Sequence, residues 1–417
     1  MTRSLTDRSL STVAGEADTP KGLTRHLVHR ALSKLSRGEL HIVERGARLS
    51  FGVPTPDALC STIRVRDPAM YGSVAVGGSV AAGESYMRGE WDCDDLTSLC
   101  RLVVRNRHVF NAVDGRLTWP LKLARSISHW FSRNTRSGSR ANIAAHYDLS
   151  NEFFALWLDS SMMYSCALYK RPDGSPIPSA DLEAAQLARL DLIVDRLGLA
   201  PGDHLLEIGT GWGAMASHAA RQSGCTVTTT TISTQQAHGA RQRALSLGVG
   251  DRVRVLEQDY RDLMGSYDKV VSLEMVEAVG HQFLDAYFQK CARLLRSGGS
   301  FVMQAIVIDD RYYEEGLHYV DFIKKHVFPG SFIPSREVLT KSAAAAGFTV
   351  ERSDEIGPHY ATTLAQWRQR FFSALPAVRR LGFDDSFIRM WEFYLCYCEA
   401  GFAEGHLGDI VYQFRKG

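Results

Sequence analysis

An acidic residue followed by a glycine-rich turn is the most informative feature of this 417-residue chain. The apolar stretch 205–208 contains Glu207 and leads into Gly209-Thr210-Gly211-Trp212-Gly213. The three glycines allow a sharp turn and a close approach of the backbone to a ligand. A helix that begins after such a turn offers free N–H groups to the polar end of that ligand. Glu207 is placed to accept hydrogen bonds from a cationic amino-acid group, so the segment predicts a cofactor site.

Two classes of cofactor could use this turn. The pattern Gly209-x-Gly211-x-x-Ala214 also satisfies a loose dinucleotide fingerprint. A dinucleotide site needs an acidic residue about 20 positions further on to bind the ribose hydroxyls. Residues 225–231 instead read Cys-Thr-Val-Thr-Thr-Thr-Thr, and Trp212 occupies a position where a pyrophosphate needs a close backbone. The residues therefore favour S-adenosylmethionine, and with it a methyltransferase, over a nicotinamide or flavin enzyme.

The elements that must position this turn follow an alternating pattern. From about residue 183, helical segments alternate with apolar strands at 204–208, 225–231, 252–257, 268–273 and 299–307. Such alternation predicts a doubly wound, mostly parallel sheet, and ligands of such sheets bind beyond the carboxyl ends of the strands. Aromatic and basic stretches after residue 310, including the run from Trp391 to Phe414, are predicted to be helices that roof the pocket.

The N-terminal part predicts a separate, smaller unit. Residues 1–20 are expected to be a flexible tail, and Leu23, Leu27, Ala31 and Leu35 then recur at helical spacing. Short alternating runs between 41 and 104 suggest a small α/β domain. We therefore predict an N-terminal lipid- or membrane-associating domain at 21–133, a linker at 134–141 and the methyltransferase domain at 142–417.

The composition is that of a soluble protein with a sizeable core. Apolar residues make up 45% of the chain, charged residues 23%, and the net charge is +2. No secretory leader and no apolar run of spanning length is apparent, so a cytoplasmic protein is expected. The eight cysteines are scattered. They predict buried free thiols and no metal site.

Seven motifs in order resemble the cyclopropane-fatty-acyl-phospholipid synthase and mycolic-acid methyltransferase family. This family modifies double bonds of lipid acyl chains with S-adenosylmethionine. The resemblance covers most of the chain from about residue 40, and it implies a Rossmann-like class I methyltransferase fold with a seven-stranded sheet and helical lid insertions. Its landmarks are the glycine turn and the segments 146–151, 163–166, 231–236, 258–262, 274–280 and 359–364.

The resemblance also implies which residues hold the cofactor. Glu207 and the glycine turn at Gly209, Gly211 and Gly213 belong to the first strand and its loop. Tyr164 and Ser165 are implied at the amino-acid end of S-adenosylmethionine. The ribose is assigned to Thr231, Ser233 and Gln236, and the adenine to Asp259 and Tyr260.

The catalytic residues implied by the resemblance surround a bound bicarbonate that serves as the base. In the family a cysteine, a glutamate, a histidine and a tyrosine hold this ion. Three of them correspond to Cys166, Glu277 and Tyr360, but the strand that carries the histidine reads Phe-Val-Met-Gln-Ala, with Gln304 at that place. A glutamine donates a hydrogen bond without ever titrating. The resemblance therefore leaves open whether bicarbonate binds here, and a displaced base predicts a change in the product.

The chemistry itself sets further requirements. An isolated alkene that attacks a sulfonium methyl group needs close alignment, a dry pocket and protection of the resulting carbocation. Each aromatic face stabilises such a cation by about 0.5–2 kcal/mol. The residues available for this role are Tyr164, Tyr319, Phe322, Phe328, Tyr360 and Trp367.

A block of basic residues at 101–140 indicates what kind of surface the protein binds. Residues 101–140 contain nine Arg or Lys and the single acid Asp114, with Trp119 and Trp130 among them. Each basic residue near an anionic leaflet adds about 1 kcal/mol of attraction. We favour an anionic membrane surface on the inner face of the membrane over nucleic acid, with an ordinary solvated surface as the alternative. A homodimer is compatible with the resemblance.

The function that these observations favour is transfer of a methyl or methylene carbon from S-adenosylmethionine to the cis double bond of an unsaturated phospholipid acyl chain. The reaction passes through a carbocation and yields a cyclopropane or a mid-chain methyl-branched or methylene fatty acid. Two alternatives stay open: a methyltransferase for a soluble small molecule, and a lipid-binding protein without catalysis. Glu207, Glu277 and Tyr360 argue against the second.

Overall fold

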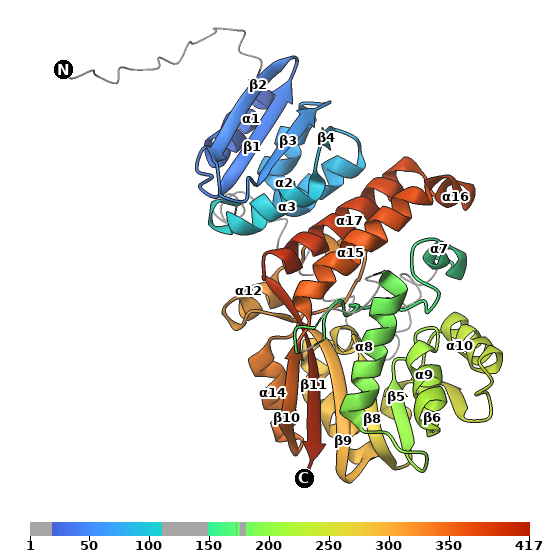
Figure 1. Cartoon of the computed structure of the whole chain (residues 1–417). Coiled ribbons are helices and arrows are strands. Elements are labelled where there is room, and N and C mark those ends of the chain that lie inside the picture. The colour runs from blue at the N-terminus through green and yellow to red at the C-terminus, as the bar shows by residue number, and fades with distance from the viewer. Residues whose placement is uncertain (1–18, 111–148, 172, 176–180) are drawn as a thin grey trace.

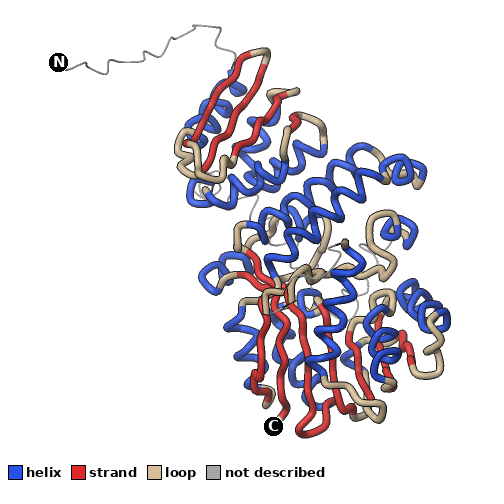
Figure 2. The backbone as a smooth tube through the Cα atoms, viewed as in Figure 1, coloured by secondary structure: helices blue, strands red, loops and turns tan. Residues whose placement is uncertain are grey.

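Two sheets organise the chain. The computed structural model describes residues 19–110, 149–171, 173–175 and 181–417, so the linker predicted at 134–141 lies outside the described residues. In Figure 1 the smaller sheet lies at the N-terminal end, and two long helices separate it from the larger sheet. Figure 2 shows the strands of the larger sheet side by side with helices packed against them.

The N-terminal sheet has four strands in the order β2-β1-β3-β4. Strands β1 and β3 are parallel, and the other two pairs are antiparallel. The burial of β1 alternates residue by residue, as expected for a strand with one face against a core. The elements are α1 (Thr19–Leu32), β1 (Gly38–Glu44), β2 (Ala47–Val53), β3 (Cys60–Val65), α2 (Ala69–Met87), β4 (Trp91–Cys93) and α3 (Leu96–Arg105).

The second sheet has seven strands in the order β10-β11-β9-β8-β5-β6-β7. Strands β5 to β9 are parallel, while β11 runs antiparallel to both of its neighbours. The predicted seven-stranded, mostly parallel sheet is therefore confirmed. The strands are β5 (His204–Ile208), β6 (Thr226–Thr231), β7 (Val253–Glu257), β8 (Tyr267–Leu273), β9 (Leu295–Ile308), β10 (Phe348–Glu355) and β11 (Leu407–Lys416).

Helices join these strands and cover the sheet, and α8 crosses its front in Figure 1. Helix α8 shows both boundary signals, with the Asp181 side chain capping its first turn and Gly198 in the left-handed conformation after its last. The helices are α7 (Asn151–Ala155), α8 (Leu182–Leu197), α9 (Ala214–Ser223), α10 (Thr234–Ser246), α11 (Leu284–Leu294), α12 (Tyr313–His318), α13 (Phe322–His326), α14 (Arg336–Ala345), α15 (Gly357–Ser373), α16 (Leu375–Arg380) and α17 (Asp385–Ala403).

The C-terminal run differs from the prediction. Helix α17 ends at Ala403, and the chain then forms β11, so the helical prediction was wrong for residues 407–414. Ile410, Val411, Tyr412 and Phe414 are β-branched or aromatic and fully buried between β9 and β10. Side chains of this kind fit a central strand better than an exposed helix.

Helix α17 ties the two sheets together. Phe393, Cys396 and Ala400 of α17 belong to the same hydrophobic cluster as the core of the N-terminal sheet. Arg101 and Arg105 each donate to Glu404 at 2.6 Å, just after α17. These two arginines of the predicted basic block therefore hold the two parts together, while residues 111–140 of the block lie outside the described residues. Among the helices that the structure describes, none is long and apolar enough to cross a membrane.

Candidate active site

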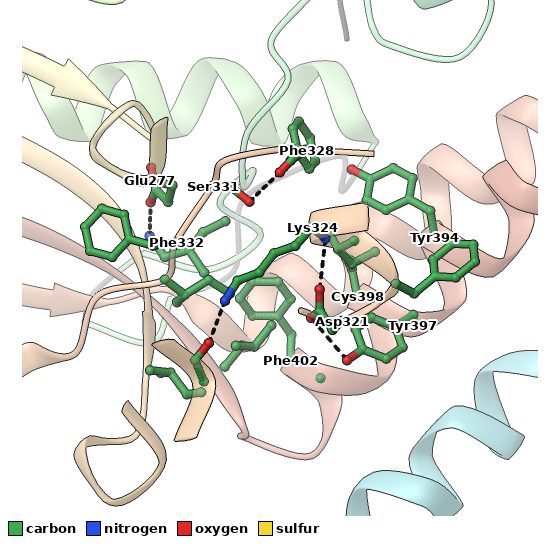
Figure 3. Close-up of a pocket in the computed structure, with 18 of the residues that line it drawn as sticks. Glu277, Asp321, Lys324, Phe328, Ser331, Phe332, Tyr394, Tyr397, Cys398 and Phe402 are labelled. Atoms are coloured by element: carbon green, nitrogen blue, oxygen red, sulfur yellow. Dashed lines mark hydrogen bonds between the residues drawn. The ribbon is translucent and has the colours of Figure 1, made fainter. Parts of the chain in front are cut away.

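Most of the predicted site residues gather near the carboxyl ends of β5, β6, β7, β8 and β9. A cavity of about 960 Å³ opens there. It continues past α12 and α13 into the N-terminal unit, where residues such as Leu40, Ile63 and Leu99 line it. Figure 3 shows Glu277 and Phe332 on one side of this space, Tyr394 and Tyr397 on the other, and Phe402 between them.

The glycine turn after β5 has the backbone that the sequence predicts. Gly209, Gly211 and Gly213 have φ values of +99°, +50° and +81°, and Gly209 and Gly211 line the cavity. Gly213 does not line it. A Cβ at Gly213 would lie 2.8 Å from the Cα of Ala240, so this glycine lets α9 and α10 pack closely.

Glu207, at the penultimate position of β5, is buried at the cavity wall. Burial raises the pKa of its carboxyl to about 8, and hydrogen bonding to Thr229 and the charge of Arg189 oppose that rise. Its Oε2 has no hydrogen-bond partner within the described part of the chain. A buried acceptor without a partner is costly unless a ligand satisfies it, so Glu207 fits a cationic cofactor.

Tyr164 and Ser165, in the segment before α8, also line the cavity. The Tyr164 hydroxyl lies 2.6 Å from that of Tyr394 on α17. The carbonyl of Ser165 accepts from Gln186, but its buried Oγ has no partner among the residues described here. Together with Glu207, this unused hydroxyl fits the polar, cationic amino-acid end of S-adenosylmethionine.

The residues predicted around the ribose and adenine lie after β6 and β7. Thr231 and Gln236 line the cavity and are joined by a hydrogen bond of 2.8 Å. Ser233 does not line it, because its hydroxyl caps the first turn of α10. Asp259 and Tyr260 both line the cavity, and Arg261 donates to both carboxylate oxygens of Asp259, at 2.8 and 2.6 Å.

Three of the four predicted catalytic residues converge on a residue that the sequence analysis did not select. Glu274 follows the last residue of β8. Its Oε1 accepts from the backbone N–H of Cys166 at 2.8 Å and from Nε2 of Gln304 at 2.6 Å. Its Oε2 accepts from the hydroxyl of Tyr360 at 2.6 Å. The thiol of Cys166 takes no part, because it donates to the carbonyls of Ala167 and Ile356.

Glu277, the fourth predicted catalytic residue, lies near this cluster but shares no hydrogen bond with Glu274 in the described part of the chain. It lines the cavity, and its Oε1 accepts from the backbone N–H of Ile306 at 2.6 Å. Its Oε2 has no hydrogen-bond partner in the described residues. Burial, and then the charge of Glu274, raise the pKa of Glu277 to about 8.

Asp409 and Arg189 hold the side chain of Gln304 in its position next to Glu274. Nε2 of Gln304 also donates to Asp409 at 2.8 Å, and its Oε1 accepts from the buried guanidinium of Arg189 at 3.0 Å. Burial raises the pKa of Asp409 well above its usual range, and the charge of Glu274 adds to that rise. Burial also raises the pKa of Glu274, but hydrogen bonds from Tyr360 and the Cys166 amide oppose the rise.

Glu274, Asp409 and Arg189 were missed by the sequence analysis. A glutamate one turn before another glutamate is typical of a solvated helix face, and Arg189 and Asp409 carry no local motif. One signal was available for Glu274, because the carboxyl end of a strand in a parallel sheet is where ligands bind. The pairing of Leu273 with Gln304 across β8 and β9 then brings Glu274 next to the glutamine.

Aromatic rings complete the wall. Five of the six rings predicted to protect a cation line the cavity, and the exception is Trp367, which is buried in the core behind Tyr164. Tyr360 stacks on Phe402 with ring centroids 4.4 Å apart. Lys324 also lines the cavity, and its ammonium group donates to the carbonyls of Gly316 and Tyr319.

Comparison with known proteins identifies the family. The family described as mycolic acid cyclopropane synthetase matches residues 134–414, more than half of the chain. The chain belongs to the mycolic acid cyclopropane synthetase family. It is 40% identical over 339 residues to the tuberculostearic acid methyltransferase of Mycobacterium tuberculosis, an alignment that covers 81% of this chain and 78% of that protein. It is 34% identical over 368 residues to the cyclopropane-fatty-acyl-phospholipid synthase of Escherichia coli K12, covering 88% and 91%.

Solved structures of the cyclopropane synthetase family share the fold and indicate the cofactor. A mycolic acid cyclopropane synthase complexed with SAH and CTAB is 32% identical, with a TM-score of 0.61 and coverage of 66% of this chain and 98% of that one. SAH is the product left when S-adenosylmethionine donates its methyl group. The protein is therefore an S-adenosylmethionine-dependent methyltransferase with a class I methyltransferase fold.

Proposed function

We propose that this enzyme transfers a methyl carbon from S-adenosylmethionine to the cis double bond of an unsaturated phospholipid acyl chain. The reaction passes through a carbocation and yields a cyclopropane or a mid-chain methyl-branched alkene or methylene group. When bound, S-adenosylmethionine supplies the electrophilic methyl group. The chain's own residues align the acyl chain, exclude water and accept a proton.

The observation that carries the proposal is the continuity of the cofactor site with a long apolar space. Gly209 and Thr231 at the sheet edge and Leu32, Leu40 and Ile63 in the N-terminal unit line one cavity. Its volume of about 960 Å³ lies near the upper end of the roughly 300–1,000 Å³ typical of ligand pockets. A long hydrocarbon chain would fill such a space, whereas a small polar substrate would leave its apolar walls without contacts.

The wall nearest the acids suits a cationic intermediate. The rings of Tyr164, Tyr360 and Phe402 line the same part of the cavity as Glu274 and Glu277. Aromatic faces stabilise a cation by about 0.5–2 kcal/mol each. Burial of this wall also keeps water from capturing the cation before it loses a proton.

The names of the two relatives support acyl chains as substrates. One is a cyclopropane-fatty-acyl-phospholipid synthase, and the other is a tuberculostearic acid methyltransferase, whose name specifies a fatty acid. The proposal therefore includes both a cyclopropane product and a methyl-branched or methylene product. A lipid-binding protein without catalysis would have no need for the buried Glu207 and the half-buried Glu274 and Glu277 at one cavity.

We also propose that the enzyme acts at an anionic membrane surface. The basic residues between 111 and 140, with Trp119 and Trp130, carry this part of the proposal by their composition alone. A phospholipid acyl chain must be taken from a bilayer, and basic and aromatic residues favour that interface.

Expression in a bacterium that makes unsaturated phospholipids tests the proposed function. Proton NMR of the extracted lipid should show upfield ring protons or exocyclic methylene protons, together with a loss of olefinic signal. Cells that express Glu207→Ala serve as the control. Unchanged lipid in cells that accumulate folded, S-adenosylmethionine-binding protein would contradict the proposal and favour a soluble substrate.

A further inference from the structure

The donors around Glu274 form a complete anion site that the protein fills with its own carboxylate. The Cys166 amide, Nε2 of Gln304 and the Tyr360 hydroxyl all point at this one group, at 2.8, 2.6 and 2.6 Å. These donors come from the segment before α8, from strand β9 and from helix α15. Their convergence from three elements indicates a site built to hold a negative charge.

The backbone of Glu274 shows that its position is enforced. Its φ is +47°, in the left-handed region that few residues other than glycine adopt. Its N–H donates to the carbonyl of Gln304 at 2.8 Å, which anchors this conformation against β9. Unfavourable backbone conformations of this kind persist where the surroundings over-determine them, and they cluster at active sites.

The donor set has no capacity left for a second anion. The Cys166 amide and the Tyr360 hydroxyl each have one hydrogen, and both are given to Glu274. The two hydrogens of the Gln304 amide go to Glu274 and Asp409. The site is also crowded with acids, because the charge of Glu274 raises the pKa of both Glu277 and Asp409. The charge of the buried Arg189 opposes the rise in the pKa of Glu274 itself.

Glu274 is half-buried and can be reached from the cavity. Besides its three donors, the neighbouring carboxyl of Asp409 interacts with it through a hydrogen bond. Glu274 also lines the cavity, beside Tyr360 and Glu277. Glu277 accepts from the backbone amides of Ile306 and of Glu277 itself, and its Oε2 has no partner among the described residues, so it is held by fewer donors than Glu274.

We propose that Glu274 is the base of this enzyme and that its carboxylate takes the place of a bound bicarbonate. This inference rests on the proposed function. The alkene π pair forms a bond to the methyl carbon, and the C–S pair stays on sulfur. The cation at the other alkene carbon then loses a proton to Glu274. The released C–H pair closes a cyclopropane if the proton leaves the new methyl group, or forms an alkene if it leaves a neighbouring carbon.

Two substitutions distinguish the role of the Glu274 carboxylate as a base from its role in filling the anion site. Glu274→Gln keeps the volume but cannot accept the proton, so product formation should fall about 100-fold, the scale of general-base catalysis, and added bicarbonate should not restore it. Glu274→Gly frees the three donors and tolerates the positive φ. Its activity should also fall, and bicarbonate or formate should restore it at least about tenfold.

The wild-type enzyme is assayed in buffer stripped of carbon dioxide, with and without added bicarbonate. Its rate should change less than about twofold, against the 10²-fold or larger effect expected of an essential base. A wild-type rate that falls on stripping and recovers with bicarbonate would overturn the proposal. Full activity of Glu274→Gln would also overturn it.

Calorimetry with sodium bicarbonate tests the anion site without any lipid. In the presence of S-adenosylhomocysteine, wild type should give no binding heat and Glu274→Gly should give saturable binding. Saturable binding to wild type would overturn the proposal, even if Glu274→Gly fails to fold. If wild type modifies no phospholipid, the proposed function fails, while the calorimetric result still decides whether the protein's carboxylate fills the site.

Discussion

The hydroxyl of Tyr360, on helix α15, donates to Oε2 of Glu274 at the end of strand β8 over 2.6 Å. The two residues are 86 positions apart, and this bond fastens the helical roof to the edge of the sheet. The same tyrosine ring stacks on Phe402. One side chain therefore aligns the proposed base and contributes to the aromatic wall beside it.

Tyr360→Phe should separate these two roles. The ring and its stacking remain, but Glu274 loses a donor worth about 1.5–3 kcal/mol for a charged acceptor. The rate of product formation should fall roughly 10- to 100-fold, while calorimetric affinity for S-adenosylmethionine stays the same. A matched control is Tyr397→Phe on α17, which removes a weaker bond of 3.4 Å to Asp321. An unchanged rate in Tyr360→Phe would show that the bond does not align the base.

Glu207 should make cofactor binding depend on pH. Because burial raises its pKa to about 8, the carboxyl is neutral at lower pH and attracts a cation weakly. Affinity for S-adenosylmethionine should therefore rise between pH 6.5 and 8, by at most about tenfold per pH unit, and level off above that range. Calorimetry across this range checks the expectation.

Two variants of Glu207 serve as controls for that titration. Glu207→Gln stays neutral and reveals any titration that belongs to the ligand itself. Glu207→Ala should abolish measurable binding, because Oε2 and its charge are both lost. Wild-type affinity in Glu207→Ala would contradict the assignment of this pocket to the cofactor.

Gln304→His should destabilise the protein. Gln304 accepts from Arg189 and donates to two carboxyls at once, which no histidine tautomer can reproduce with two ring nitrogens. A buried group left unpaired costs about 1–3 kcal/mol. Urea unfolding should show that loss, and Gln369→His on the exposed face of α15 should show none. Equal stability of Gln304→His and wild type would mean that the network relaxes around histidine.

Much of the fold could be predicted because it depends on local pattern. The five parallel strands and the glycine turn are short-range features, and each lies within a few residues of its predicted place. Strand β11 was taken for helix, because its identity depends on pairing with β9 and β10 rather than on its own sequence.

The centre of the site depends on long-range contacts, which explains what was missed. Cys166 and Gln304 were selected as ligands of an ion, yet they converge on Glu274, 108 and 30 residues away. The one local signal for Glu274 is its position directly after strand β8, and its spacing from Glu277 is otherwise that of a solvated acid. Only the pairing of β8 with β9 and the approach of α15 place donors around it.

The basic block should govern binding to membranes. Arg125→Glu, Arg133→Glu and Arg136→Glu combined should weaken binding to anionic vesicles by about 1 kcal/mol per site at low salt. The matched control reverses Arg221, Arg254 and Arg293, which are exposed on the methyltransferase domain. Sedimentation with vesicles measures both. Unchanged vesicle binding with weaker oligonucleotide binding would favour a nucleic-acid surface instead.

The most direct test of methyl transfer to an acyl chain uses purified enzyme, S-adenosylmethionine labelled with ¹³C in its methyl group, and vesicles of a monounsaturated phospholipid. Carbon NMR of the extracted lipid follows the label. We predict that wild type places the ¹³C on the acyl chain, in a ring, methyl or methylene carbon, and that Glu207→Ala places none. Lipid that stays unlabelled in the presence of folded, cofactor-binding wild-type enzyme would contradict the account.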